Sequence, residues 1–374
     1  MKKSVSFLAL LVAAVLLGSA PSFAQEIEFP ETEQIRVLGR CLTGTDGLYL
    51  SWTNSGVEFV FEGTQATASL GLSSPEDEPA LMGVFVDDEE EASELLIVDS
   101  QEQSLTLAQD LEAGEHTLRL LKLSEARYGT VVLKSLRTDG ESLLPTEPRE
   151  RLIEFIGDSI TCGFGTLAEE KDNPFQVTQE DGSLTYAYLL ASAFEADFRF
   201  ICCSGIGVFS NNTGDRAHVM PAIYPYVQYF VQQQEQPPVA KDLLWTDTPH
   251  QEADLVVLHL GTNDEAVLGL EGEESLTQFQ NAYAAFLKQV RAVNPEAKIL
   301  VTYGAMRLGL APWIEQAVET YRNQTGDEEI ATFMYDFLAQ KEIGGLTAGH
   351  PSAFIHSQMA DALWEPVCEL TGWD

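Results

Sequence analysis

Four short stretches of the sequence carry residues that could together cleave an ester. They are Ser159 in "FIGDSITCGFG", Gly205 in "CCSGIG", Asn263 in "HLGTND" and His350 in "GGLTAGHPS". A serine hydroxyl can attack a carbonyl carbon, a histidine can take its proton, and amide N–H groups can hold the resulting oxyanion. The set therefore predicts acyl transfer through a serine nucleophile.

Each of these residues also has an ordinary structural explanation. A serine at a strand-to-helix junction commonly caps the helix, a glycine commonly makes a turn, and an asparagine commonly closes an Asx-turn. The prediction therefore depends on the four residues lying at one place in the fold. Asp264, next to Asn263, is expected to hold the surrounding loop.

His350 is the best candidate for the base because it lies in a glycine-rich loop and is followed by Pro351, which fixes the backbone. Two other histidines lie in regular elements: His259 in an apolar stretch expected to be a buried strand, and His356 along the expected last helix. The remaining histidines have no companions of the right chemistry: His116, His218 and His250.

The elements that must position this set follow residue 145. Strand-like apolar stretches are "LIEFIG", "FRFICC", "DLVVLHL", "KILVTYG" and "ATFMYDF". Between and after them we expect helices over 184–196, 217–232, 275–293 and 313–323, and a last one after His350. Alternating strands and helices predict a parallel sheet covered on both faces, with the site beyond the carboxyl ends of the strands. All four candidate residues fall at that edge.

The preceding part of the chain has a different pattern. Short alternating runs such as "VEFVFEG", "ATASLGL" and "HTLRLLKL" are separated by turn-forming residues, with no helical period. Many short strands at near-regular spacing predict a β-sandwich. We therefore expect a β-sandwich domain over 25–145 and an α/β domain over 146–374.

The first residues, 1–24, have the pattern of a signal peptide. Lys2 and Lys3 precede an apolar stretch over 7–17, and Ser22-Phe23-Ala24 matches a small-x-small cleavage site. No later stretch approaches the roughly 20 apolar residues of a membrane span. The sequence therefore predicts a secreted or periplasmic protein without a membrane span.

Composition limits the partners. Asp and Glu number 58 against 21 Lys and Arg, a net charge of −37, which disfavours binding to nucleic acid or anionic lipid. The cysteines are too few and too scattered for a disulfide framework, although a single disulfide bridge is possible. None of them has the spacing of a zinc site. They are Cys41, Cys162, Cys202, Cys203 and Cys368.

The ordered motifs resemble the SGNH, or GDSL-type, hydrolases, whose four blocks are similar to "GDSI", the Gly205 turn, "GTND" and "HPS". A sandwich followed by "GDSITCGFG", "CCSGIG", "MPAIYPY", "GTND" and "HPSAFIH" resembles carbohydrate esterase family two in particular. This resemblance implies a flavodoxin-like three-layer α/β/α SGNH domain with a parallel sheet, preceded by an all-β jelly-roll sandwich. It implies a serine esterase that removes acetyl groups from plant polysaccharides such as xylan or glucomannan, with no metal or cofactor.

By the same resemblance, Ser159 is the nucleophile and His350 the base. The oxyanion hole would be the N–H groups of Ser159 and Gly205 with the side chain of Asn263. One feature departs from the pattern: many SGNH members have an Asp just upstream of the His, whereas this chain has Thr347, Ala348 and Gly349. We therefore expect a Ser-His dyad whose imidazole is held by a backbone carbonyl or a distant side chain.

Three alternatives remain at this point. A metallophosphoesterase could use Asp158, Asn263 and His350 as ligands, but the further Asp or His ligands of a two-metal site are not evident. A carbohydrate-binding protein with an inactive catalytic half would explain the missing Asp. An SGNH esterase acting on another acyl substrate is the third.

Overall fold

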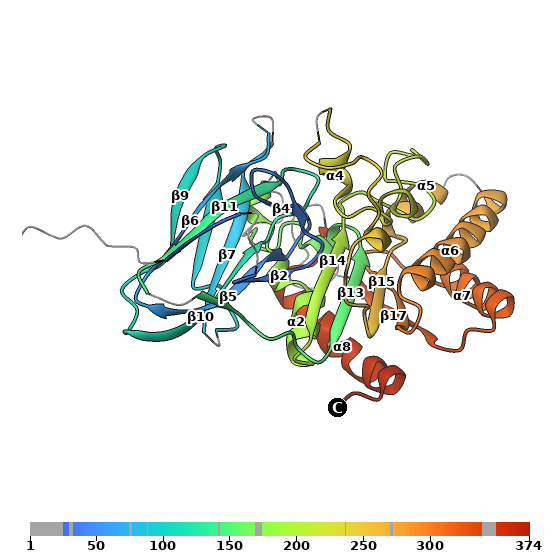
Figure 1. Cartoon of the computed structure of the whole chain (residues 1–374). Helices are drawn as coiled ribbons and strands as arrows, with labels where there is room; N and C mark the ends of the chain where they lie inside the picture. Colours follow the sequence, from blue (N-terminus) through green and yellow to red (C-terminus); the bar gives the residue numbers. More distant parts are fainter. Residues whose placement is uncertain are drawn as a thin grey trace, which may run out of the picture.

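The computed structural model describes residues 25–29, 33–74, 77–87, 89–140, 143–168, 174–235, 237–269, 272–338 and 349–374. It places an all-β domain beside an α/β domain (Figure 1). The predicted signal peptide, 1–24, lies outside the described residues and stays a prediction. Of the helices that are described, none combines the length and apolar character that crossing a bilayer requires.

Two antiparallel sheets form the N-terminal domain, as predicted. One has the strand order β3-β4-β11-β6-β9, with β1 pairing on β11; the other has the order β12-β5-β10-β7-β8, with β2 pairing on β5. The strands are β1 Gln25–Glu28, β2 Arg36–Leu38, β3 Leu42–Thr43, β4 Leu48–Leu50, β5 Ser55–Gly63, β6 Ala66–Leu72, β7 Ala80–Val86, β8 Glu94–Val98, β9 Gln103–Ala108, β10 Gly114–Lys122, β11 Val131–Thr138 and β12 Leu143–Pro145.

Alternation along β5 shows how the sequence builds this core. Val57, Phe59 and Phe61 are fully buried, because successive side chains of a strand point to opposite faces. Phe59 lies opposite Leu118 of the neighbouring strand β10. These side chains share one buried cluster with residues of the other sheet, such as Leu70 of β6, so the two sheets bury their apolar faces against each other.

The second domain contains a parallel sheet with the strand order β14-β13-β15-β16-β17. In chain order this is 2-1-3-4-5, the flavodoxin-like arrangement that was predicted. The strands are β13 Leu152–Gly157, β14 Asp197–Cys202, β15 Leu255–His259, β16 Lys298–Ala305 and β17 Ile330–Leu338. Ligand sites in such sheets lie where the order reverses, here between β13 and β15.

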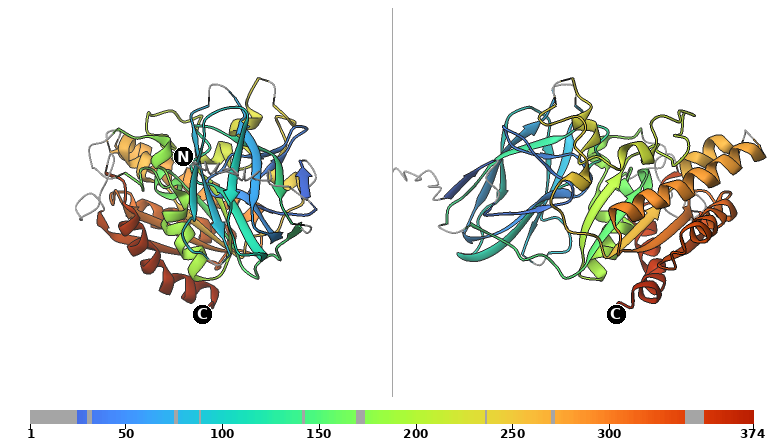
Figure 2. Two further views of the ribbon diagram at one scale, coloured as in Figure 1. Left: turned by 90° about the vertical axis from the view of Figure 1, so that its left-hand side faces the viewer. Right: turned by 45° about the vertical axis from the view of Figure 1, so that its right-hand side comes forward.

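Helices cover both faces of this sheet (Figure 2). α2 and α8 pack together on one side, and α6 and α7 pack together on the other. The helices are α1 Ser159–Cys162, α2 Tyr186–Ala193, α3 Met220–Ile223, α4 Tyr229–Gln232, α5 Thr262–Leu268, α6 Glu273–Val293, α7 Ala311–Thr325 and α8 Ala353–Thr371, with 3₁₀ turns η1 Val177–Gln179, η2 Gly182–Leu184 and η3 Trp245–Asp247.

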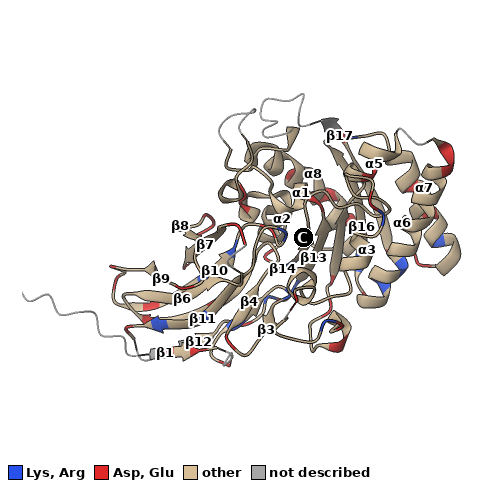
Figure 3. Ribbon diagram, turned by 90° about the horizontal axis from the view of Figure 1, so that it is seen from above, with Lys and Arg blue, Asp and Glu red and all other residues tan. Residues whose placement is uncertain are grey.

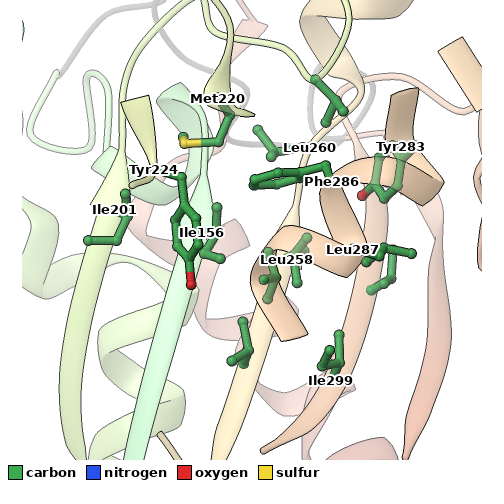
Figure 4. Close-up of a cluster of buried hydrophobic side chains, with 14 of the residues drawn as sticks. Ile156, Ile201, Met220, Tyr224, Leu258, Leu260, Tyr283, Phe286, Leu287 and Ile299 are labelled. Atoms are coloured by element: carbon green, nitrogen blue, oxygen red, sulfur yellow. The ribbon is translucent and has the colours of Figure 1, made fainter. Parts of the chain in front are cut away.

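The apolar stripe of α6 fills the space above one face of the sheet. Phe279, Tyr283, Phe286, Leu287 and Val290 recur at helical spacing and are buried. In Figure 4, labelled residues of this stripe lie over side chains from the sheet. The same packing explains why the predicted helix 275–293 is close to the observed one.

One predicted helix is wrong. Instead of a single helix over 217–232, the structure has the short helices α3 and α4. Pro225 between them has no N–H to continue a helix. The side chain of Gln228 also donates to the backbone carbonyls of Arg40 and Tyr49, at 3.0 and 2.6 Å, and so ties the segment to the first domain.

A buried ion pair joins the domains. Arg40 of the first domain and Glu154 of β13 are fully buried, with 3.1 Å between guanidinium and carboxylate. Arg199 contacts the same carboxylate at 2.9 Å. Burial acts to raise the pKa of Glu154, but the two guanidinium groups outweigh it, so that pKa is lowered.

The antiparallel strands end at Pro145 and the parallel sheet begins at Leu152. We therefore propose the domain boundary at residues 145/146.

Candidate active site at the carboxyl edge of the parallel sheet

Ser159 is the first residue of α1 and is separated from the end of β13 by one residue, Asp158. Asp158 caps this short helix, its carboxylate accepting from the N–H of Ile160 at 3.0 Å. The first N–H groups of a helix have no partner within it. The N–H of Ser159 is therefore at a position where it can bind an anion beside its own hydroxyl.

The imidazole of His350 reaches Ser159 across 191 positions of sequence. The Nε2 atom of His350 and the Oγ atom of Ser159 are 2.8 Å apart, the separation that a base and a serine nucleophile require. Residues 347 and 348 lie outside the described part of the chain. The expectation that a backbone carbonyl or a distant side chain orients this ring thus stays a prediction.

Gly205 follows β14 in a backbone conformation that favours glycine. Its φ is +78°, in the left-handed region, and an added Cβ would lie 3.0 Å from the side chain of Asn212. The carbonyl of Gly205 accepts from the N–H of Asn212 at 2.9 Å. No described residue accepts a hydrogen bond from the N–H of Gly205.

Asn263, in the first turn of α5 after β15, turns its amide toward the same loop. Its Nδ2 donates to the carbonyl oxygen of Ile206 at 2.8 Å and to the carboxylate of Asp158 at 3.3 Å. These contacts join the strand ends of β13, β14 and β15. The structure thus brings the four candidate residues together at the carboxyl edge of the parallel sheet, as the sequence predicted.

Asp264 holds the loop, as expected. Its buried carboxylate accepts three backbone N–H groups, those of Val208, Phe209 and Ser210, at 2.8 to 2.9 Å. Burial raises its pKa to about 6, against the lowering effect of those hydrogen bonds. The pKa of Asp158 is likewise raised to about 7, mainly by burial and in smaller part by the nearby carboxylate of Asp264.

The histidines set aside in the sequence lie elsewhere. His259 and His356 are buried in the core, and burial lowers the pKa of each imidazole to about 3. His116 contacts Asp87, and His218 contacts Asp215. Within the described residues, His350 is the imidazole that contacts Ser159.

An aromatic contact to the candidate base is not evident from the sequence. The rings of Phe164 and His350 have centroids 4.4 Å apart, and Phe164 stacks on Phe175 at 3.7 Å. Phe175 in turn lies near Tyr128 of the sandwich, at 5.4 Å. The one signal in the sequence is that Phe164, in "GFG", lies shortly after the candidate nucleophile Ser159.

A cavity of about 270 Å³ opens beside Gly205. Its lining combines polar and aromatic side chains, including Arg127, Asn212, His218, Tyr229 and Phe230. A larger cavity, about 520 Å³, lies at the domain junction around Arg36 and Trp245 and includes none of the four candidate residues. Of these two cavities, the smaller one is therefore the one that adjoins the candidate site.

A buried polar cluster lies beneath the site, between the domains. The ligand-type atoms of Glu125, Cys162 and Glu180 lie within 4.8 Å of one another. Burial raises the pKa of both glutamates and lowers that of nearby Lys122 to about 8. All five cysteine thiols are free, so the bridge left open by the sequence is not formed.

Comparison with family models identifies both domains. Residues 37–148 match the N-terminal domain of carbohydrate esterase 2, and residues 155–343 match the GDSL-like lipase/acylhydrolase family. The chain belongs to the GDSL-like lipase/acylhydrolase family, which places it among the carboxylic ester hydrolases. Its two domains together are those of the family two carbohydrate esterases.

Several relatives match most of the length of this chain. Cellulase/esterase CelE of Acetivibrio thermocellus is 27% identical over 362 residues, 94% of this chain and 41% of that protein. An acetylxylan esterase/glucomannan deacetylase of Cellvibrio japonicus is 25% identical over 346 residues, 91% of this chain and 89% of the relative. A family two carbohydrate esterase from Clostridium thermocellum, solved with cellohexaose, has a TM-score of 0.80 and 27% identity, covering 91% of this chain and all of that one.

Proposed function

We propose that the protein is a serine esterase that removes O-acetyl groups from plant cell-wall polysaccharides such as xylan or glucomannan. The observation that carries the proposal is the 2.8 Å contact between Ser159 and His350. The donors at Gly205 and Asn263 lie at the same sheet edge. The Cellvibrio japonicus relative, an acetylxylan esterase/glucomannan deacetylase, supports the choice of acyl group and of polysaccharide.

The reaction divides into two steps. The hydroxyl oxygen of Ser159 attacks the acetyl carbonyl while Nε2 of His350 takes its proton. His350 then gives that proton to the departing sugar oxygen, which leaves as a hydroxyl, and the acetyl group stays on Ser159. Water, deprotonated by His350, attacks this ester; acetate leaves, and His350 returns the proton to the oxygen of Ser159. Every proton transfer in this scheme uses one imidazole nitrogen.

The oxyanion formed in each step is held by three donors. They are the N–H of Ser159 at the start of α1, the N–H of Gly205, and the side-chain amide of Asn263. The side-chain amide of Asn263 has two N–H bonds. One donates to the carbonyl of Ile206 at 2.8 Å and anchors the side chain; the other makes the longer contact, 3.3 Å, with Asp158, and we assign this second N–H to the oxyanion. Such donors aimed in advance at developing charge provide a large part of catalysis.

The substrate side is a neutral glycan. Acidic residues are spread over both domains (Figure 3), which disfavours anionic substrates. Tyr229 and Phe230 of the cavity beside Gly205 offer aromatic faces, and Asn212 and His218 offer hydrogen bonds. We propose that a sugar unit binds in this cavity.

We also propose that residues 1–24 direct the chain to a secreted or periplasmic location.

The test is acetate release from acetylated xylan, acetylated glucomannan and 4-nitrophenyl acetate, with and without a chelator. We expect release from at least one polysaccharide, unchanged by the chelator. Release from 4-nitrophenyl acetate alone would favour another acyl substrate. No release from any of the three would favour a carbohydrate-binding protein, and loss of activity with the chelator would favour a metal-dependent reaction.

A further inference from the structure

The peptide group between Ser204 and Gly205 is contacted by a side chain of the other domain. Nη1 of Arg127, in the loop between β10 and β11 of the sandwich, donates to the carbonyl oxygen of Ser204 at 3.0 Å. The C=O and N–H of a planar trans peptide point in opposite directions. A guanidinium held on this carbonyl therefore fixes the direction in which the N–H of Gly205 points.

The preceding peptide is held by the same loop. The buried carboxylate of Glu125 accepts from the N–H of Ser204 at 2.7 Å. The loop is anchored in turn, because the N–H of Glu125 donates to Glu180 at 2.8 Å and the ammonium group of Lys122 donates to the carbonyl of Glu125 at 2.9 Å. Arg127 thus extends from a fixed segment, although its own side chain is exposed.

The contact has an electrostatic consequence as well. A cation on the carbonyl polarises the amide, and hydrogen bonds in a chain strengthen one another. The N–H of Gly205 becomes a stronger donor at the moment when negative charge develops opposite it. Both effects act on an atom of the α/β domain but arise from a side chain of the sandwich domain.

We propose that Arg127 is a positioning residue for the oxyanion hole, and that the sandwich domain thereby contributes to the rate of ester hydrolysis. The proposal rests on the proposed function, since it assigns the N–H of Gly205 to the oxyanion. Arg127 acts through the Ser204–Gly205 peptide. Its effect should therefore appear in the transition state more than in substrate binding.

The test compares full-length Arg127→Met and Arg127→Lys with the parent. The readouts are kcat and KM for 4-nitrophenyl acetate, and inhibition by methylboronic acid, whose tetrahedral adduct with a serine mimics the oxyanion. Loss of a whole oxyanion donor costs about a hundredfold to a thousandfold in kcat. For Arg127→Met, which misdirects one donor, we expect kcat to fall about tenfold, with KM within about twofold and boronate inhibition weakened about tenfold.

The lysine variant separates the two roles of the guanidinium. An ammonium group can still donate to the Ser204 carbonyl, so Arg127→Lys should recover part of the lost rate. The matched control is Arg137→Met on β11, whose guanidinium is about half exposed and pairs with Glu26 at 2.6 Å. Like Arg127→Met, it removes one exposed arginine of the sandwich domain, and it should behave as the parent.

Several outcomes would overturn the inference: parental kcat in Arg127→Met, a loss confined to KM, or a lower kcat with unchanged boronate inhibition. Ser159→Ala, measured alongside, separates this inference from the proposed function. If Ser159→Ala is inactive and Arg127→Met is fully active, the inference alone fails. If Ser159→Ala keeps the parental rate, the proposed function fails and the inference fails with it.

Discussion

The imidazole of His350 lies against the phenyl ring of Phe164, with ring centroids 4.4 Å apart and ring planes inclined by 32°. Phe164 is held in turn by Phe175, whose ring is nearly parallel to it at 3.7 Å. A ring face against an imidazole limits its rotation, and it would attract the imidazolium that the proposed proton transfer from Ser159 to His350 forms. The aromatic contact thus contributes to holding the imidazole of His350, the proposed base.

Replacing Phe164 with leucine should lower kcat about two- to tenfold, because aromatic pairs contribute about 0.5–1.5 kcal/mol beyond their buried area. Phe164→Tyr keeps the ring and should stay near the parental rate. Hydrolysis of 4-nitrophenyl acetate, with Tm measured beside it, checks both variants. A leucine variant as fast as the parent would show that the ring does not position His350.

Gly205→Ala should lose both stability and activity. At a φ of +78° a side chain costs about 1–2 kcal/mol, and the new Cβ would press on Asn212 next to the proposed oxyanion donor. Gly326→Ala is the matched control, because Gly326 has a φ of +73° at the end of α7 with open space around it. Urea unfolding should show a similar loss in both, with kcat reduced only in Gly205→Ala; equal kcat in the two variants would contradict the role of this loop.

The raised pKa of Asp158 predicts a pH dependence of stability. Burial moves this pKa from its ordinary value of 3.8 to about 7, so between these values the folded chain binds more protons than the unfolded chain. The contribution of Asp158 to the free energy of unfolding therefore falls as pH rises from about 4 to about 7. This stabilising contribution is fully present below the pKa that Asp158 has in the unfolded chain, 3.8.

Asp158→Asn removes this titration. The free energy of unfolding of the parent minus that of the variant should decrease between about pH 4 and about pH 7.5, as measured by urea unfolding. Asp361→Asn, at an exposed position on α8, should show no such trend relative to the parent. A parent-minus-variant difference that stayed level or grew with pH would mean that Asp158 ionises normally in the folded chain.

The interdomain ion pair gives a prediction about stability alone. Arg40→Ala leaves the fully buried carboxylate of Glu154 with one guanidinium instead of two and should destabilise the chain by about 3–5 kcal/mol. The exposed pair between Arg137 and Glu26 should contribute about 1 kcal/mol or less when Arg137 is replaced by alanine. Urea unfolding of the two alanine variants measures the contrast; equal losses would mean that Arg40 does not join the domains.

The α/β domain was largely predictable because its signals are local. Buried parallel strands are continuous apolar runs, and the stripe of α6 has an unmistakable helical period. The convergence of Ser159, Gly205 and Asn263 followed from topology alone, since the carboxyl ends of parallel strands share one edge.

What the sequence did not predict depends on contacts between distant segments. The break between α3 and α4 reflects the bonds of Gln228 to the other domain, which no local pattern encodes. The short strands β3 and β12 have too few residues for an alternating pattern. The contacts of Phe164 with His350 and of Arg127 with Ser204 span long stretches of chain in the same way.

The most direct measurement is acetate release from an acetylated polysaccharide substrate by Ser159→Ala, compared with the parent and with Ser192→Ala. Ser192 is an exposed serine on α2, so its variant controls for loss of a hydroxyl group. We predict that Ser159→Ala loses at least about a thousandfold in kcat while Ser192→Ala matches the parent. Undiminished acetate release by Ser159→Ala would contradict the assignment of Ser159 as the nucleophile.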